Sequence, residues 1–394
     1  MAVVAIIPLP EPGHINPTIR LARELRERGH DVKFVSAPAA ATLFRQRGLP
    51  TVIASERPWV EPWEIDFSVD LTPDVALVES TFPYLGMWAW RLGWNIINLS
   101  VLFPRGYEAS VPPLGTRLLP SATAEGKRLL REAWAAERRA NTERRMLGVR
   151  RLADRIGFPA HLLDERSALG VTLRFPELAL VPEVLDFPRA ANPMTAYAGP
   201  CVELMRTEPE FDFTQLTNGK KLVYCSVGTQ VKRYPSLPGR LSTLVEAARR
   251  LPDLQVVIAT GIELLEAHLS APLPSNVVLL RNAPQLAMLQ RAAVMLTHGG
   301  INAINEALCC GVPLIVLPFD IDQPGNAARI EYHGLGKCLP WEEATPDVMA
   351  NAIRCMIENG AINDRVRAMS GRLRSMLEEP GPALAFEQCW ARCR

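Results

Sequence analysis

The sequence predicts an α/β protein with two doubly wound domains that face a cleft. Three observations predict this class. Short β-branched runs alternate with helix-length segments along the chain, because parallel strands need crossover connections. A polar, irregular stretch near the middle separates two such patterns. The 394 residues are enough for two or three domains.

The first half opens with a strand, a helix and a second strand. Residues 2–7 form a continuous β-branched run, as a strand buried on both faces requires. Residues 15–28 carry apolar side chains at helical spacing, and Gly29 ends that helix. Residues 31–36 then form a strand, so the unit predicts a parallel sheet. Later strands of this half are predicted at residues 75–78 and 95–102.

The second half repeats this alternation after an acidic stretch that is predicted to be a linker. Its predicted strands are residues 221–226, 255–259, 277–280, 294–297 and 314–317. A helix-length segment lies between most of these strands. Two sequential doubly wound halves leave a cleft at the carboxyl ends of their sheets, where α/β proteins bind ligands.

Charge and composition exclude several classes of protein. The chain carries 43 Lys and Arg against 42 Asp and Glu, and a net charge of +1 gives no bulk attraction for nucleic acid. Its 48% apolar and 22% charged residues are those of an ordinary globular chain, not of a disordered, collagenous or coiled-coil one.

Cysteine use and the N-terminus predict a cytoplasmic location. All eight cysteines lie in the second half and none forms a CxxC pair, so neither a disulfide framework nor a zinc site is expected. The first residues read as a buried strand rather than a signal peptide. No uncharged apolar run reaches the roughly 20 residues that span a membrane.

Residues 127–155 are locally basic, with ten Lys or Arg against four Asp or Glu. The simpler interpretation is the solvated face of a long helix, which is predicted within residues 117–157. A second interpretation is a surface that makes weak contact with an anionic membrane or attracts an anionic substrate.

The most informative stretch is residues 282–327. A buried strand ends there in His298, Gly299 and Gly300, and a helix begins directly afterwards. Glycines at such a turn let a phosphate approach the exposed N–H groups of the helix, whose dipole favours negative charge. His298 can donate to that phosphate, and Asn302 in the first turn of the helix can add another donor.

Two further polar features suit a sugar nucleotide. Glu306, in an otherwise apolar helix, can accept hydrogen bonds from two vicinal hydroxyls such as a ribose diol. Asp322 and Gln323 follow a strand end, and a carboxylate beside a carboxamide offers directional partners to sugar hydroxyls. Each feature alone is a weak signal, but their order within one short stretch indicates a nucleotide-sugar site.

These motifs resemble those of the UDP-glycosyltransferase superfamily, which has two Rossmann-like domains in the GT-B arrangement. The resemblance rests on PQ…HGG.N…E…GVP…P…DQ…NA and on the opening PLPEPGHINP. The sequence is most similar to the bacterial macrolide and zeaxanthin glucosyltransferases, through APQLA.L, DQPGNAARI and LVYCSVGT. The resemblance implies an acceptor domain (1–205), a linker (206–219), a donor domain (220–379), and a C-terminal helix (380–394) that crosses back to the acceptor domain.

The resemblance also implies roles for the matching residues. His14 would be the general base, and Glu79, at the end of a later strand, would orient it where the family has an Asp. The other positions would bind the donor: Ser226, Thr229, His298, Gly300 and Asn302 the diphosphate, Ala283 and Gln285 the uracil and ribose, Glu306 the ribose, and Asp322 and Gln323 the sugar. Neither a metal nor a cofactor is expected, since protein donors neutralise the leaving diphosphate.

Two positions depart from the family pattern. Asn282 stands where an aromatic residue, often Trp, usually stacks on uracil, so backbone contacts or another ring would hold the base. Ala303 replaces a common Ser or Thr donor to phosphate, a loss of about 1 kcal/mol in donor binding.

The predicted function is an inverting, metal-independent transfer of a hexose, by expectation glucose, from a UDP-sugar to a hydroxyl of an apolar natural product. A carboxylate at Glu306 that reads both ribose hydroxyls favours UDP over a deoxyribose carrier. Five tryptophans either pack the core or line the acceptor pocket: Trp59, Trp63, Trp88, Trp90 and Trp94. The alternatives are a dTDP-deoxysugar transferase, a sugar-nucleotide epimerase and a non-catalytic sugar-nucleotide-binding protein. The protein is expected to be a monomer or a homodimer.

Overall fold

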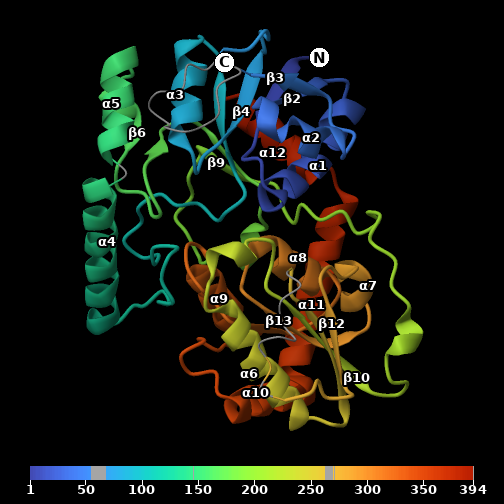
Figure 1. Ribbon diagram of the computed structural model, residues 1–394. Coiled ribbons are helices and arrows are strands. Elements are labelled where there is room, and N and C mark those ends of the chain that lie inside the picture. Colours follow the sequence, from blue (N-terminus) through green and yellow to red (C-terminus); the bar gives the residue numbers. More distant parts are fainter. Residues whose placement is uncertain (55–67, 145, 262–268, 270, 394) are drawn as a thin grey trace. The chain divides into compact units, whose positions relative to one another are not determined.

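The computed structural model describes residues 1–54, 68–144, 146–261, 269 and 271–393. The chain divides into two compact units, Met1–Val202 with Met376–Arg394, and Glu203–Ser375. Each unit is built on a parallel sheet with helices around it (Figure 1). The predicted α/β class is therefore confirmed. Trp59 and Trp63 lie outside the described residues.

The first unit contains a seven-stranded parallel sheet in the order β3-β2-β1-β4-β5-β8-β9. Its strands are β1 (Val3–Ile7), β2 (Asp31–Ser36), β3 (Thr51–Ile53), β4 (Val75–Glu79), β5 (Ile96–Ser100), β8 (Glu177–Ala179) and β9 (Thr195–Tyr197). The strand order reverses between β1 and β4, which makes their carboxyl ends a topological switch point. The residues that follow β1 and β4 are therefore brought together.

The helices of this unit begin as their sequences favour. The first helix starts at Pro12, three residues before the predicted start, because proline is well suited to the first turn of a helix. The helices are α1 (Pro12–Glu27), α2 (Ala41–Arg45), α3 (Pro83–Arg91), α4 (Ala124–Arg144), α5 (Met146–Ile156) and α12 (Gly381–Trp390), with single 3-10 turns at Pro38–Ala40, Ala160–Leu162 and Glu183–Leu185. A short antiparallel pair joins β6 (Leu163–Asp164) to β7 (Thr172–Leu173).

The basic region forms α4 and α5. Most of α4 is exposed, with Leu130 and Trp134 among its few buried side chains. Arg128 forms ion pairs with Glu125 and Glu132, both at 2.6 Å, so part of the positive charge is neutralised within the helix. These features suit a solvated helix face, and contact with a membrane surface stays a prediction. No helix among the described residues is long and apolar enough to span a membrane.

The tryptophans of α3 take part in core packing. Trp88, Trp90 and Trp94 are partly buried and pack against the hydrophobic clusters beneath α3. Arg155 of α5 lies 5.5 Å from the centre of the Trp88 ring. Packing therefore accounts for these three side chains.

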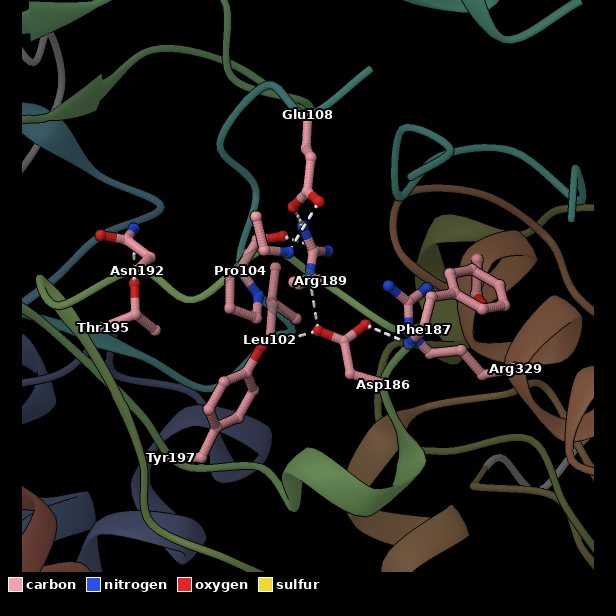
Figure 2. A network of polar contacts seen from close by, with 12 residues as sticks. Leu102, Pro104, Glu108, Asp186, Phe187, Arg189, Asn192, Thr195, Tyr197 and Arg329 are labelled. Carbon is pink, nitrogen blue, oxygen red and sulfur yellow. Dashed lines mark hydrogen bonds and ion pairs between the residues drawn. The ribbon is translucent and has the colours of Figure 1, made fainter. Parts of the chain in front are cut away.

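A partly buried polar network fixes the loop that follows β5 (Figure 2). The Arg189 guanidinium donates to the Asp186 carboxylate at 2.6 Å and to the Pro104 carbonyl at 2.9 Å. Tyr197 of β9 donates to the same carboxylate at 2.8 Å, and Glu108 accepts from the Ala190 backbone N–H at 2.9 Å. The loop is thus held to the β9 side of the sheet at its carboxyl edge.

The C-terminal segment is anchored to the first unit by a buried ion pair in α1. Arg20 and Glu24 lie 2.6 Å apart and are almost fully buried. Arg20 also donates to the carbonyls of Leu377 and Glu379, and Glu24 accepts from the Ala383 N–H at 3.1 Å. These contacts satisfy carbonyls near the end of α11 and an N–H in the first turn of α12, so α12 packs against α1 and the edge of the sheet.

The second unit contains a six-stranded parallel sheet in the order β12-β11-β10-β13-β14-β15. Its strands are β10 (Lys221–Ser226), β11 (Leu254–Ala259), β12 (Val277–Leu280), β13 (Ala292–Thr297), β14 (Leu314–Val316) and β15 (Gly336–Cys338). Its helices are α6 (Leu237–Arg249), α7 (Gln285–Leu289), α8 (Ile301–Cys309), α9 (Gln323–Tyr332), α10 (Pro346–Glu358) and α11 (Gly360–Glu378), with 3-10 turns at Phe213–Gln215 and Val231–Arg233. Here the strand order reverses between β10 and β13.

Candidate active site

His14 and Glu79 form a pair at the switch point of the first sheet. Residue 14 lies in the first turn of α1, after β1, and residue 79 ends the neighbouring strand β4. His14 Nδ1 lies 2.9 Å from Glu79 Oε2. The Glu79 side chain is completely buried and the imidazole is mostly buried. The extra methylene of Glu, relative to the Asp of the family, does not prevent this contact.

The second oxygen of Glu79 is also satisfied. Oε1 accepts from the hydroxyl of Thr81 at 2.9 Å and from its backbone N–H at 3.3 Å. Burial by itself would raise the pKa of Glu79, but His14 and the two Thr81 hydrogen bonds together hold that pKa below its ordinary value. Because an ionised carboxylate only accepts, His14 donates through Nδ1, and Nε2 carries the lone pair of the neutral ring.

The imidazole of His298 is held between two glycine turns at the switch point of the second sheet. A Cβ on Gly228, after β10, would lie 2.5 Å from the ring, and a Cβ on Gly300 would lie 2.7 Å from Nε2. Gly228 and Gly299 have φ values of +78° and +95°, which side-chain-bearing residues rarely adopt. The glycines therefore let the ring pack directly against the backbone.

This environment keeps His298 neutral. Burial lowers its pKa to about 4, against a smaller opposing effect of the Ser226 backbone. Its buried Nδ1 has no hydrogen-bond partner among the described residues, so a ligand group can supply one. The first residue of α8 follows Gly300, an N-cap residue that has no side chain to cap the helix. The turn thus presents a neutral ring and uncapped N–H groups, a combination that suits a phosphate.

The remaining predicted phosphate donors lie in the same two turns. Ser226 ends β10 and is half-buried, and Thr229 is exposed in the turn that follows. Asn302 lies in the first turn of α8 and is half-buried, as is Ala303 beside it. The switch point between β10 and β13 therefore carries all the residues that the sequence predicts for the diphosphate.

The two predicted ribose residues contact one another. Gln285 Nε2 donates to Glu306 Oε2 at 2.7 Å. Arg206 binds both oxygens of the Glu306 carboxylate and also donates to Glu208 at 3.0 Å. Glu208 in turn accepts from the backbone N–H groups of residues 286 and 287. The segment predicted to be a linker therefore contributes a fixed cation and a cap to the second unit.

Among the described residues, Asn282 and Ala283, which are predicted to lie near the uracil base, make no side-chain hydrogen bond comparable to the one between Gln285 and Glu306. Ala283 is half-buried just before α7, and Asn282 is exposed.

Nothing in the sequence separates residues 206 and 208 from their irregular surroundings, because their partners lie about 80 to 100 residues away. Arg206 and Glu208 could be found only from the structure.

Asn326 connects Asp322, one of the two residues predicted to bind the sugar, to the turn at Gly299 that is predicted to bind phosphate. This side chain is almost fully buried, and its Nδ2 donates to Asp322 Oδ2 at 2.7 Å and to the Gly299 carbonyl at 2.9 Å. Asp322 is the residue before α9, and Gln323 is the first residue of that helix. Asn326 thus links the loop predicted to bind the sugar to the turn predicted to bind phosphate. The sequence alone does not predict this role for Asn326.

Comparisons with known proteins show which proteins this chain resembles. The family model described as "Erythromycin biosynthesis protein CIII-like, C-terminal domain" matches residues 243–391. The oleandomycin glycosyltransferase of Streptomyces antibioticus is 26% identical, over 94% of this chain and 87% of that protein. The zeaxanthin glucosyltransferase of Pantoea ananas is 29% identical, over 77% of this chain and 69% of that protein. These similarities support the UDP-glycosyltransferase superfamily for this chain.

Solved structures place this glycosyltransferase in the GT-B fold. The glycosyltransferase of kitacinnamycin superposes with a TM-score of 0.72 at 24% identity, over 98% of this chain and 97% of that chain. The calicheamicin glycosyltransferase CalG4 superposes with a TM-score of 0.70 at 22% identity, over 99% and 98%. The predicted family and fold are confirmed, and the protein is a glycosyltransferase of natural-product type.

The close approach of Gly300 to His298 makes a prediction about nucleotide binding by this glycosyltransferase. Gly300→Ala should weaken UDP binding roughly tenfold, because its Cβ would displace the imidazole and remove a hydrogen bond to the diphosphate. The backbone φ of −64° at this position suits alanine, so the fold should be retained. Gly239→Ala in α6, where a Cβ meets nothing within 4 Å, is the matched control. Titration calorimetry with UDP measures both variants, and equal affinities would contradict the assignment.

The lowered pKa of Glu79 predicts how stability depends on pH. The ionised carboxylate stabilises the fold above its ordinary pKa of 4.5, and this contribution is lost as pH falls from there toward the lower folded pKa. Glu79→Gln has no such titration. The difference in free energy of unfolding between wild type and variant should therefore shrink as the pH falls from about 4.5 toward the lower folded pKa of Glu79. Urea unfolding at several pH values tests this, and a difference that grows in acid contradicts it.

Proposed function

We propose that the protein transfers glucose from UDP-glucose to a hydroxyl of an apolar small molecule, with inversion and without a metal. The observation that carries this proposal is the His14–Glu79 pair, a polarised imidazole held by a buried carboxylate at a ligand-binding edge of a parallel sheet. A general base needs this arrangement, since the carboxylate stabilises the imidazolium that forms when the ring takes a proton.

In the proposed reaction, His14 Nε2 takes the proton of the acceptor hydroxyl. The acceptor oxygen attacks the anomeric carbon of the α-linked donor, the bond from that carbon to the diphosphate breaks, and its electron pair leaves with UDP. Attack from the opposite face gives a β-glycoside. General base catalysis contributes roughly 10²- to 10⁴-fold to the rate.

The second unit is proposed to stabilise the leaving diphosphate. The N–H groups that begin α8 would donate to its oxygens, as would His298 in the neutral tautomer that carries its single proton on Nδ1, with Ser226, Thr229 and Asn302 as further donors. Such preorganised donors act where negative charge develops, so a metal is not required. The nucleotide sugar is a co-substrate, and no cofactor is proposed.

Gln285 and Glu306 are proposed to bind the ribose. Arg206 and Gln285 already fix the Glu306 carboxylate, so it is oriented before a nucleotide arrives. Asp322 and Gln323 are proposed to bind the sugar. Both are held by protein hydrogen bonds, and leaving such groups without sugar hydroxyls would cost binding energy. This favours a fully hydroxylated hexose over a deoxysugar.

A dTDP-deoxysugar transferase is the second candidate function. The spinosyn rhamnosyltransferase SpnG, solved with thymidine diphosphate, and VinC, solved with dTDP, both superpose with TM-scores of 0.64 at identities of 18% and 16%. They share the fold with this chain. The acceptor proposed for either donor is an apolar, hydroxylated natural product.

Removing the proposed base predicts a loss of rate without a loss of donor binding. His14→Ala should lower kcat by roughly 10²- to 10⁴-fold, because no other group would take the acceptor proton. UDP affinity should stay within about twofold, since the proposed UDP ligands lie in the other unit. Product formation from UDP-glucose and a panel of hydroxylated aglycones is measured by mass spectrometry. His161→Ala, on an exposed turn, is the control, and undiminished turnover by His14→Ala would exclude the proposed base.

Nucleotide affinity separates the two candidate donors. UDP should bind roughly 5- to 30-fold more tightly than dUDP, which lacks only the 2′-hydroxyl that Gln285 or Glu306 would bind. The dTDP affinity should resemble that of dUDP, since the remaining difference is the methyl group of thymine. Titration calorimetry with the three nucleotides measures this. Tighter binding of dTDP than of UDP would favour the deoxysugar transferase.

A further inference from the structure

Tyr234, which lies in the segment between β10 and α6, reaches the predicted sugar loop. Its hydroxyl lies 2.7 Å from Asp320 Oδ1 and 3.2 Å from Gln323 Nε2. Its ring stacks on Phe319, with ring centres 4.0 Å apart and an interplanar angle of 14°. Arg240 of α6 lies 4.9 Å from the centre of the Phe319 ring. The phenol is therefore held in place by its ring, independently of its hydroxyl.

The hydrogen bonds around Gln323 determine the orientation of its carboxamide. The backbone N–H of Phe319 can only donate, so the atom that faces it at 2.8 Å must be the oxygen Oε1. Nε2 then faces Tyr234 and donates to its hydroxyl oxygen, and that hydroxyl donates its own proton to Asp320. A reversed carboxamide would place N–H against N–H at Phe319. The Phe319 N–H thus selects the orientation, and the directed chain from Gln323 through Tyr234 to Asp320 holds the other end of the carboxamide.

The loop that carries this chain is strained. Ile321 has a φ of +58°, which is rare for a β-branched residue and lies between the two acidic residues of the loop. Asp320 on one side is bound by Tyr234 and by Arg233, and Asp322 on the other is bound by Asn326. Such conformations persist where the surroundings fix them, and they occur often at ligand sites.

We propose that Tyr234 is a positioning residue for the donor sugar. Its hydroxyl fixes the Gln323 carboxamide, so that the second N–H of the carboxamide and the free lone pair of its oxygen meet the sugar hydroxyls in one arrangement. This inference rests on the proposed function, in which Gln323 binds the transferred sugar. Tyr234 acts through Gln323. Burial, followed by the hydrogen bond to Asp320, raises the pKa of Tyr234 to about 12, so the phenol keeps its proton at neutral pH.

Tyr234→Phe tests the proposal because it removes the hydroxyl and retains the stacked ring. The expected result is a roughly 5-fold lower kcat/KM for UDP-glucose, the size that loss of one neutral hydrogen bond produces. The ratio of kcat/KM between UDP-glucose and UDP-galactose should also fall, because a carboxamide held only by the Phe319 N–H is less closely fixed and discriminates less between the two arrangements of hydroxyls. The affinity for UDP, which has no sugar, should stay within twofold of wild type.

Two further variants complete the experiment. Asp320→Asn retains an oxygen that accepts from the phenol and should keep the donor ratio of wild type, whereas Asp320→Ala should lower it. Tyr332→Phe, on α9, is the matched control, since its ring contacts His333 and it lies outside the proposed sugar loop. Because Asp320 is exposed, the alanine variant at this position gives a second test if Tyr234→Phe does not fold.

The outcomes distinguish this inference from the proposed function. If wild type transfers sugar and Tyr234→Phe has the same donor ratio, Tyr234 has no positioning role. A parallel loss of UDP and UDP-glucose affinity in Tyr234→Phe also overturns the inference, because it indicates a general disturbance of the unit. If wild type binds UDP but transfers no sugar to any acceptor, the proposed function fails and the inference fails with it.

Discussion

The reversal of strand order beside the first strand of each sheet is the constraint on which both groups of candidate residues depend. In a parallel sheet all carboxyl ends lie at one edge, and chain connections leave in opposite directions only where the order reverses. In the first unit this point lies between β1 and β4 and brings His14 to Glu79. In the second unit it lies between β10 and β13 and brings Gly228 to His298. One topological rule, applied twice, accounts for the proposed base in one unit and the proposed phosphate-binding turn in the other.

Polar groups brought to such an edge must be satisfied by protein contacts before any ligand arrives. Glu79 is bound by His14 and Thr81, and Glu306 by Arg206 and Gln285. Each contact fixes the orientation of a group that is proposed to act on substrate, so little conformational entropy remains to be lost on binding. The exception is Nδ1 of His298, which is buried and has no partner among the described residues. That exception lies where the diphosphate is expected.

The sequence predicts the fold class and most of the strands, because buried parallel strands are short apolar runs bounded by turn residues. It predicts the family through its motifs. The strands at residues 31–36, 221–226 and 277–280 have the predicted bounds. The three-residue strands β3, β8, β9 and β15 are not predicted, whereas β14, of the same length, is predicted because it lies in a continuous apolar run. Contacts between distant polar residues leave no local signal. Arg206 lies in a stretch that reads as a linker, yet it binds Glu306, 100 residues further along the chain. Gly228 and Asn326 stand within recognised motifs, but only the structure shows what they touch.

The small net charge of the chain, +1, is compatible with the proposed diphosphate site, because that site is proposed to act through N–H groups and a helix dipole. The diphosphate of the bound donor is already dianionic, so part of the attraction of a fixed cation would strengthen binding of the donor before any charge develops. A neutral His298, with its pKa of about 4, and the N–H groups of α8 interact most strongly when charge has developed on the diphosphate oxygens. Arg206, a cation of this unit, is occupied by Glu306 and Glu208. The positive charge is thus used to orient the proposed ribose ligand, and the donors to the proposed leaving group remain neutral.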